Sequence, residues 1–178
     1  FDDLKEIIQP DLLDLANDTS FGNPYKFNVK GYLTNEAILD HIYFLHIIKK
    51  NIDKNKNIDK NKLNIVEIGG GYGGLSRLLK IAYPKAKIIL FDLPQTNFIS
   101  EYYLKNNFPN FTFQNLENCN FANKKKLTID KDFTILPGWH IDKIENSSVD
   151  LVINIRSFME MEIKTVNNYL MIINKILK

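Results

Sequence analysis

Residues 65–74 read Ile-Val-Glu-Ile-Gly-Gly-Gly-Tyr-Gly-Gly and say more about the structure than any other segment of the chain. An apolar strand leads into an acid, Glu67, and then into a cluster of glycines. Glycine at Gly69, Gly71 and Gly73 lets the backbone adopt positive φ angles and approach a bound molecule closely. Apolar residues at helical spacing follow, so the loop opens a helix and presents free N–H groups at its positive end. The segment predicts a small-ligand site between a strand and a helix.

The composition sets bounds on the class of protein. A chain of 178 residues that is 44% hydrophobic can build one domain with a hydrophobic core. The lysine-rich run 49–62 contains no aromatic residues, so we expect no nucleic-acid partner. No apolar stretch is long enough for a membrane span and no signal peptide is visible. The single cysteine, Cys119, fits a reducing compartment, so we expect a cytoplasmic protein whose oligomeric state the sequence leaves open.

The N-terminal third is predicted to differ from the rest of the chain. Residues 1–50 are predicted as a helical cap segment, with helices over residues 2–15 and 35–50, and Thr34 can cap the second helix. Residues 51–62 are the hexapeptide Asn-Ile-Asp-Lys-Asn-Lys twice in succession. Because this sequence is charged and of low complexity, we interpret it as a linker.

Residues 63–178 alternate between strand and helix patterns and are predicted as a Rossmann-like domain. The predicted strands are residues 63–68, 87–91, 132–138 and 149–155, with 111–113 as a further candidate. Their apolar runs lack alternation, which indicates burial on both faces of a parallel sheet flanked by helices. We expect the strand order 3-2-1-4, with the ligand crevice at the carboxyl ends beside the first strand. A last helix over residues 162–177 is predicted to bury Val166, Leu170, Ile173 and Leu177.

Two classes of cofactor compete for the predicted crevice. The pattern G-x-G-x-x-G begins at Gly69, and Asp92 lies 18 residues after Gly74, which fits a nicotinamide dinucleotide. However, Glu67 lies two residues before the first glycine. An acid at the mouth of the loop repels a pyrophosphate and favours a cofactor that carries an ammonium and a sulfonium. The acid-glycine motif is that of class I S-adenosylmethionine-dependent methyltransferases, which we favour over an oxidoreductase.

Three segments resemble the bacterial family of sugar O-methyltransferases, which is associated with surface polysaccharide and glycan biosynthesis. They are residues 65–79, Phe91-Asp-Leu-Pro94 and residues 154–161. Where Ser-Met-Gln-Glu-Met is expected, this chain has Ser157-Phe-Met-Glu-Met161 and therefore lacks the glutamine. The resemblance covers residues 63–178. It implies transfer of a methyl group to a sugar hydroxyl of a small-molecule or glycan acceptor, and a fold whose C-terminal strands are missing from this chain.

The resemblance also implies roles for individual residues. Glu67 would orient the glycine loop and receive the ammonium of the cofactor, directly or through water, while Asp92 would accept hydrogen bonds from both ribose hydroxyls. Gly138 and Trp139 would border the adenine, and Asn154 with the three residues after it would line the floor below the sulfonium. Two alternatives remain open: Asp92 can instead cap the following helix, and Trp139, the single tryptophan, can be a core residue.

A sugar hydroxyl is a poor nucleophile until its proton leaves, so the reaction requires a general base near the methyl group. The candidates are Glu160 and His140. Glu160 follows the fourth predicted strand between Met159 and Met161, in a pocket that we expect to be apolar. His140 can equally be a surface or adenine-side residue. Nothing in the spacing of the acids and histidines requires a metal, and a domain that binds the cofactor without catalysis is the remaining alternative.

Overall fold

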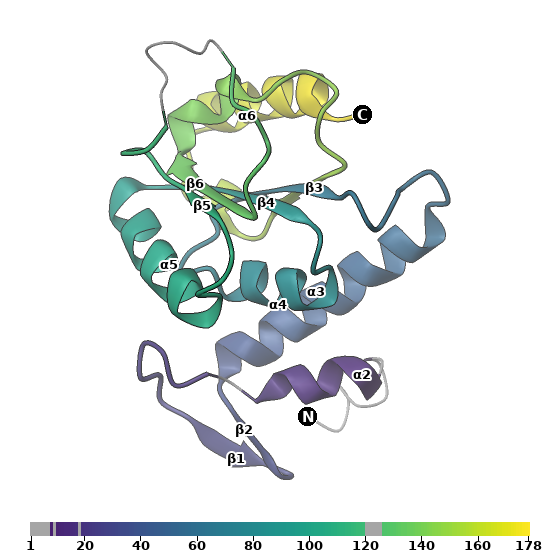
Figure 1. The fold of residues 1–178 in the computed structure, drawn as a ribbon, viewed down its shortest axis with the longest axis vertical. Coiled ribbons are helices and arrows are strands. Elements are labelled where there is room, and N and C mark those ends of the chain that lie inside the picture. Colours follow the sequence, from purple (N-terminus) through teal and green to yellow (C-terminus); the bar gives the residue numbers. More distant parts are fainter. Residues whose placement is uncertain (1–7, 9, 18, 120–125) are drawn as a thin grey trace.

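A parallel sheet of five strands forms the centre of the computed structural model, which describes residues 8, 10–17, 19–119 and 126–178 (Figure 1). The strands are β3 (Asn64–Ile68), β4 (Lys87–Asp92), β5 (Phe113–Gln114), β6 (Phe133–Pro137) and β7 (Leu151–Asn154). They lie in the order β5-β6-β4-β3-β7, and every neighbouring pair is parallel. The four main strands therefore confirm the predicted order 3-2-1-4. The further candidate segment adds β5 at the edge beside β6.

Helices cover both faces of this sheet (Figure 1). The helices α3 (Glu36–Lys54), α4 (Gly74–Ala82) and α5 (Pro94–Asn107) lie on one face, whereas the 3-10 helix η2 (Gly138–Lys143) and α6 (Ile163–Ile176) lie on the other. Strand residues alternate between the two cores: Ile65 packs with α3 and α4, and its neighbour Val66 packs with η2 and α6. Because both faces are covered, the strands are buried almost throughout, as their apolar runs predicted.

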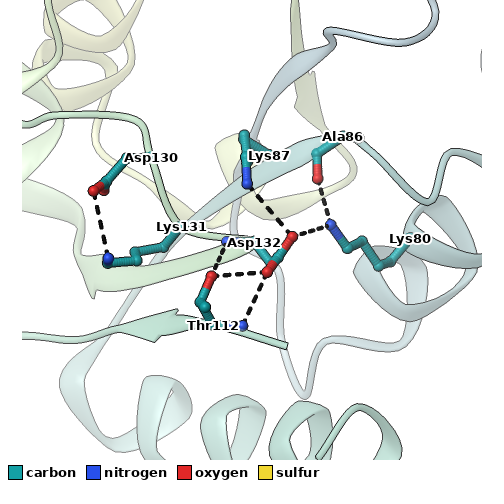
Figure 2. A network of polar contacts seen from close by, with 7 residues as sticks. All are labelled: Lys80, Ala86, Lys87, Thr112, Asp130, Lys131 and Asp132. Atoms are coloured by element: carbon teal, nitrogen blue, oxygen red, sulfur yellow. Dashed lines mark hydrogen bonds and ion pairs between the residues drawn. The ribbon is translucent and has the colours of Figure 1, made fainter. Parts of the chain in front are cut away.

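A buried lysine joins the edge of the sheet to α4 at the amino ends of the strands (Figure 2). Lys80 Nζ donates to Asp132 Oδ1 at 2.9 Å and to the Ala86 carbonyl at 2.6 Å. Asp132 also accepts hydrogen bonds from the backbone N–H and the hydroxyl of Thr112, at 2.9 and 2.7 Å. The ammonium lies 4.8 Å from the ring centre of Phe111. Asp132 and Thr112 immediately precede β6 and β5, so the network holds these two strands against α4.

The N-terminal part differs from its predicted form. The helix α3 begins after Asn35, whose Oδ1 accepts from Ile38 N at 3.0 Å, so Asn35 and not Thr34 is the cap. Thr34 instead ends a short hairpin of β1 (Phe27–Val29) and β2 (Tyr32–Thr34), which the sequence did not reveal. The helix continues to Lys54, into the predicted linker, because Ile52 is buried and extends its apolar stripe.

The remaining predicted helices are placed as follows. Residues 2–7 and 9 of the predicted helix over residues 2–15 lie outside the described residues, and α2 (Pro10–Leu13) and η1 (Asp14–Ala16) form its end. The predicted last helix is α6. Its face toward the sheet carries Tyr169, Ile172, Ile173 and Ile176, whereas the predicted face member Leu170 is 51% exposed. Within the described residues no helix is both long and apolar enough to cross a membrane.

Candidate active site

A cavity of about 970 Å³ opens at the carboxyl ends of the parallel strands. Its walls come from four segments: the glycine loop after β3, the end of β4 with the start of α5, the 3-10 helix η2 after β6, and the segment from β7 to α6. The lining residues are Gly69, Gly71, Phe91, Asp92, Leu93, Thr96, Gly138, Trp139, Ile141, Asp142, Ile155, Arg156, Ser157, Glu160, Met161, Thr165, Asn168, Tyr169 and Ile172. The cavity therefore lies where a parallel sheet of this order places its ligand crevice.

The glycine loop forms the wall of the cavity between β3 and α4. Gly69 has φ 75° and donates its N–H to the carbonyl of Phe91 at 2.7 Å. A Cβ atom at Gly69 would lie 2.2 Å from Ser157 Oγ, so only glycine fits there. Gly71 has φ 57° and open space where a Cβ would project. Gly73, the third predicted glycine, does not line the cavity but adopts φ 89° and caps α4. The loop therefore leaves room for a ligand above Gly71.

Asp92 ends β4 and faces the cavity. Its Oδ2 accepts a hydrogen bond from Gly71 N at 2.9 Å, and its Oδ1 accepts one from Leu93 N at 2.7 Å. No side-chain cap forms at the start of α5, which begins at Pro94. The alternative role of Asp92 as a helix cap is therefore wrong. Each carboxylate oxygen retains capacity to accept a further hydrogen bond from a ligand.

Glu67 does not line the cavity. The strand alternation that directs Val66 toward η2 directs Glu67 toward α4, where its side chain is only 5% exposed beneath the glycine loop. Its Oε2 accepts a hydrogen bond from the hydroxyl of Ser76 on α4. Burial raises the pKa of Glu67 to about 7, the Ser76 hydrogen bond opposes this rise, and the charge of Asp92 adds to it. The predicted acid at the mouth of the loop is thus corrected: Glu67 supports the loop from below.

The far wall carries Gly138 and Trp139 directly after β6. Trp139 is 62% exposed at the rim, so its alternative role as a core residue is wrong. A Cβ atom at Gly138 would lie 2.3 Å from the hydroxyl of Tyr169, which reaches across from α6. Burial, and after it the charge of Asp92, raises the pKa of Tyr169. Tyr169 is a cavity residue that the sequence did not identify, because its position depends on how α6 is rotated against the sheet.

Asn154 at the end of β7 does not line the cavity, but its side chain connects the segments that form the cavity floor. Its Nδ2 donates to the carbonyl of Ile68 at 3.0 Å and to the hydroxyl of Ser157. The same hydroxyl reaches the Ile68 carbonyl at 3.2 Å. These bonds tie the ends of β3 and β7 to the segment that follows, and Ser157 itself lines the cavity beside Gly69.

The two candidate bases are placed differently. Glu160 lines the cavity at the end of the 3-10 helix η3 (Ser157–Glu160) and is exposed. Of its two flanking methionines, Met161 lines the cavity and packs against the core, whereas Met159 is 87% exposed, so the expected apolar surroundings are formed on one side only. His140 is half-buried in η2 and does not line the cavity. Burial lowers its pKa, Asp142 opposes this effect and Lys143 adds to it. Of the two, only Glu160 lines the cavity.

Arg156, which belongs to the predicted floor segment, and Asp142, which no motif singled out, add charges to the cavity wall. Arg156 has a φ of 70°, a backbone conformation that is strained for any residue other than glycine. Its guanidinium lies 3.2 Å from a carboxylate oxygen of Asp40 on α3, so it links the N-terminal helix to the rim. Within the described residues no group of three or more histidines, cysteines and acids is arranged to hold a metal ion.

Solved structures with similar folds include several methyltransferases. They include a Methanococcus maripaludis protein described as an S-adenosyl-L-methionine-dependent methyltransferase (21% identity, TM-score 0.46, covering 74% of this chain and 50% of that one). The mitomycin 7-O-methyltransferase shows 17% identity and a TM-score of 0.47, with 79% and 36% covered. The protein PKMT2 from Rickettsia typhi, in complex with AdoHcy, shows 15% identity and a TM-score of 0.46, with 68% and 20% covered. The chain thus spans half or less of the length of these proteins.

The family assignment comes from the sequence itself. A search of curated proteins found no match. Residues 5–123, about two thirds of the chain, match the family model described as O-methyltransferase domain. This match confirms the predicted class, which uses S-adenosylmethionine, and decides against the nicotinamide alternative. The chain belongs to the family of O-methyltransferase domains.

Proposed function

We propose that the whole protein transfers the methyl group of S-adenosylmethionine to a hydroxyl group of a sugar, in the synthesis of a surface polysaccharide or another glycan. The observation that carries the proposal is the composition of the cavity wall. Gly71 and Asp92, which are joined by a hydrogen bond, suit an amino-acid nucleoside, and an exposed carboxylate, Glu160, lines the same cavity. The predicted cytoplasmic location remains a prediction.

The residues present fit the cofactor. The open space above Gly71 would admit the cofactor against the backbone of the loop. Asp92 has two acceptor oxygens for a vicinal diol such as the ribose hydroxyls. Trp139 at the rim presents an aromatic surface for a purine, with Gly138 beside it. Glu67, from its buried position, would hold the loop in this form through Ser76, and not contact the cofactor directly.

S-adenosylmethionine, when bound, supplies a methyl group on a positively charged sulfur, which is open to attack by an oxygen. The protein must place the acceptor hydroxyl in line with that methyl group and take up its proton. Glu160 is the candidate base, since its carboxylate faces the cavity and can accept the proton from the hydroxyl. Ser157 and Asn154 fix the segment that carries Glu160 to the end of β3.

A sugar acceptor is supported by the polar side chains around Glu160. Arg156, Thr165 and Asn168 line the same cavity as Glu160, and their side chains can form hydrogen bonds with a ligand. The Asp92-Leu-Pro94 and Ser157-x-x-Glu-Met161 segments, which resemble sugar O-methyltransferases, both lie on this cavity. The polar side chains of the cavity wall can bind the hydroxyl groups of a sugar acceptor.

The proposal is tested by incubating the whole protein with S-adenosylmethionine labelled in its methyl group and with a panel of sugars and oligosaccharides. We expect label in a sugar ether, and a loss of about 100-fold or more in kcat for Glu160→Gln with little change in cofactor affinity. Glu162→Gln, a neighbouring exposed acid outside the cavity, is the matched control. Cofactor binding without transfer to any sugar would favour the remaining alternative, a binding-only domain.

A further inference from the structure

The charged side chains of the cavity are mostly acidic. Among the described lining residues Asp92, Asp142 and Glu160 are acids, and Arg156 is the sole base. An acidic cavity suits a cofactor with a sulfonium and an ammonium. It does not suit an additional anion, because no lining lysine or second arginine is present to receive one.

The single arginine is already matched by an acid. Arg156 Nη2 lies 3.2 Å from Asp40 Oδ2, and both side chains are more than half exposed. Asp40 lies in the first turns of α3, a helix that runs toward the amino ends of the strands, so its start lies beside the carboxyl ends. Asp40 does not itself line the cavity, whereas Glu160, four residues after Arg156, does; the wall and the acid beside it together carry one positive and two negative charges.

This arrangement can recognise uncharged hydroxyl groups. The guanidinium offers donors beyond the one that faces Asp40, and the Asp40 carboxylate offers acceptors beyond the one that faces Arg156. A vicinal diol can donate to the carboxylate and accept from the guanidinium at once. A carboxylate or phosphate on the acceptor would have to compete with Asp40 for Arg156 and would face Glu160 as a like charge.

We infer that the acceptor is an uncharged sugar, free or within a neutral glycan, and not a sugar acid, a sugar phosphate or a nucleotide-linked sugar. This inference rests on the proposed function, because it specifies the acceptor of the same site. Its physical basis is the charge of Arg156 and Glu160 on the cavity wall and of Asp40 next to Arg156.

The test measures binding and turnover with matched pairs of acceptors. The pairs are glucose with glucuronate, galactose with galacturonate, and glucose with glucose 1-phosphate. Affinity for the whole protein saturated with S-adenosylhomocysteine is measured by ligand-detected NMR, and kcat/KM is measured with labelled S-adenosylmethionine. For the best pair we expect a preference of about three- to ten-fold for the neutral member at low salt, which shrinks at 0.5 M salt because exposed charges are screened.

Substitutions in α3 test whether the charge of Asp40 causes the preference for neutral acceptors. Asp40→Asn should reduce the preference for the neutral acceptor of each pair, and Asp40→Lys should abolish or reverse this preference. The matched controls are Asp53→Asn and Asp53→Lys on the same helix, about 20 Å away along its axis. Asp53 also pairs with a cation, Lys49, at 3.5 Å, but lies at the opposite end of α3. The control variants should keep the wild-type preference.

The outcomes distinguish failure of the neutral-acceptor inference from failure of the proposed sugar methyltransferase function. Methyl transfer to a uronate or sugar phosphate as fast as to the neutral partner would overturn the inference and leave the sugar methyltransferase intact. An unchanged preference in Asp40→Lys, or one insensitive to salt, would also overturn it. If no sugar of either charge binds to the protein saturated with S-adenosylhomocysteine, the inference and the proposed function fail together.

Discussion

Gly71 N donates a hydrogen bond to Asp92 Oδ2 at 2.9 Å, which fastens the glycine loop after β3 to the end of β4. The same carboxylate faces the cavity, so one side chain both shapes the loop and offers acceptors to a ligand. The contact explains why an acid at the end of the second predicted strand accompanies a glycine cluster at the end of the first.

Asp92→Asn should weaken binding of S-adenosylhomocysteine. The amide removes the charge and one acceptor, and hydrogen bonds to a charged group contribute roughly 1.5 to 3 kcal/mol, so we expect about 10- to 100-fold lower affinity. Isothermal titration calorimetry of the whole protein measures the change. Asp130→Asn, an exposed acid that pairs with Lys131, is the control and should bind as the wild type does. Equal affinity in Asp92→Asn would remove this residue from the site.

The burial of Glu67 predicts a pH dependence of stability. Its pKa in the folded protein is about 7, above the ordinary value of 4.5, so the folded state holds a proton that the unfolded state loses between these values. The group therefore lowers the free energy of unfolding as pH rises from about 4.5 to 7, by roughly 3 kcal/mol, and has no further effect above. Glu67→Gln should lack this decrease.

Urea unfolding of the two proteins at pH 5, 6, 7 and 8 checks this expectation through the difference between their free energies of unfolding. The free energy of unfolding of the wild type should fall relative to that of Glu67→Gln up to about pH 7, and the difference should then stay constant. Glu160→Gln, in which an exposed acid is changed, should follow the wild type. Parallel curves for wild type and Glu67→Gln would show that Glu67 is not protonated in its buried position.

Gly138 and Tyr169 should behave as a coupled pair. In Gly138→Ala the new Cβ would lie 2.3 Å from the Tyr169 hydroxyl oxygen and 3.7 Å from Tyr169 Cζ. We expect a loss of about 1 to 3 kcal/mol in the free energy of unfolding from overpacking. Tyr169→Phe removes the clashing oxygen, so the double variant should recover most of this loss. A double-mutant cycle with additive effects would contradict the observed contact.

Lys80 should matter for stability and not for cofactor affinity. Lys80→Met removes the buried member of an ion pair with Asp132, which is 20% exposed and keeps Lys87 at 3.5 Å, so we expect a loss of about 1.5 to 3 kcal/mol in the free energy of unfolding. Burial lowers the pKa of Lys80, while Asp132 opposes this effect. Because the network lies at the amino ends of the strands, the variant that remains folded should bind S-adenosylhomocysteine with wild-type affinity. Lys131→Met, from an exposed pair, should leave both quantities unchanged.

The sheet and the glycine loop could be predicted because their signals are local. The apolar runs of β3, β4 and β6 lack alternation, which requires burial on both faces and therefore a parallel sheet. The glycine cluster after β3 requires positive φ angles in a tight turn, and the structure has them at Gly69, Gly71 and Gly73. Both patterns are complete within a few residues, so no tertiary information was needed.

The errors concern features that depend on distant packing. The acid Glu67 was expected at the surface of the loop, yet its direction follows the alternation of β3 and the presence of Ser76 on α4. The sequence did not predict Tyr169 as a cavity residue, because the rotation of α6 brings Tyr169, and not Leu170, against the sheet. The hairpin of β1 and β2 has strands of three residues, too short for a periodicity to be visible.

The fluorescence of Trp139, the single tryptophan of the sequence, offers the most direct test of the methyl-donor site. Its indole is 62% exposed at the rim of the cavity, so a purine that binds there must change its emission. Titration of the whole protein with S-adenosylhomocysteine should give a saturable change that Trp139→Phe abolishes, whereas NAD⁺ at the same concentrations should give none. A saturable response to NAD⁺, or calorimetric binding of S-adenosylhomocysteine that leaves this emission unchanged, would contradict the account.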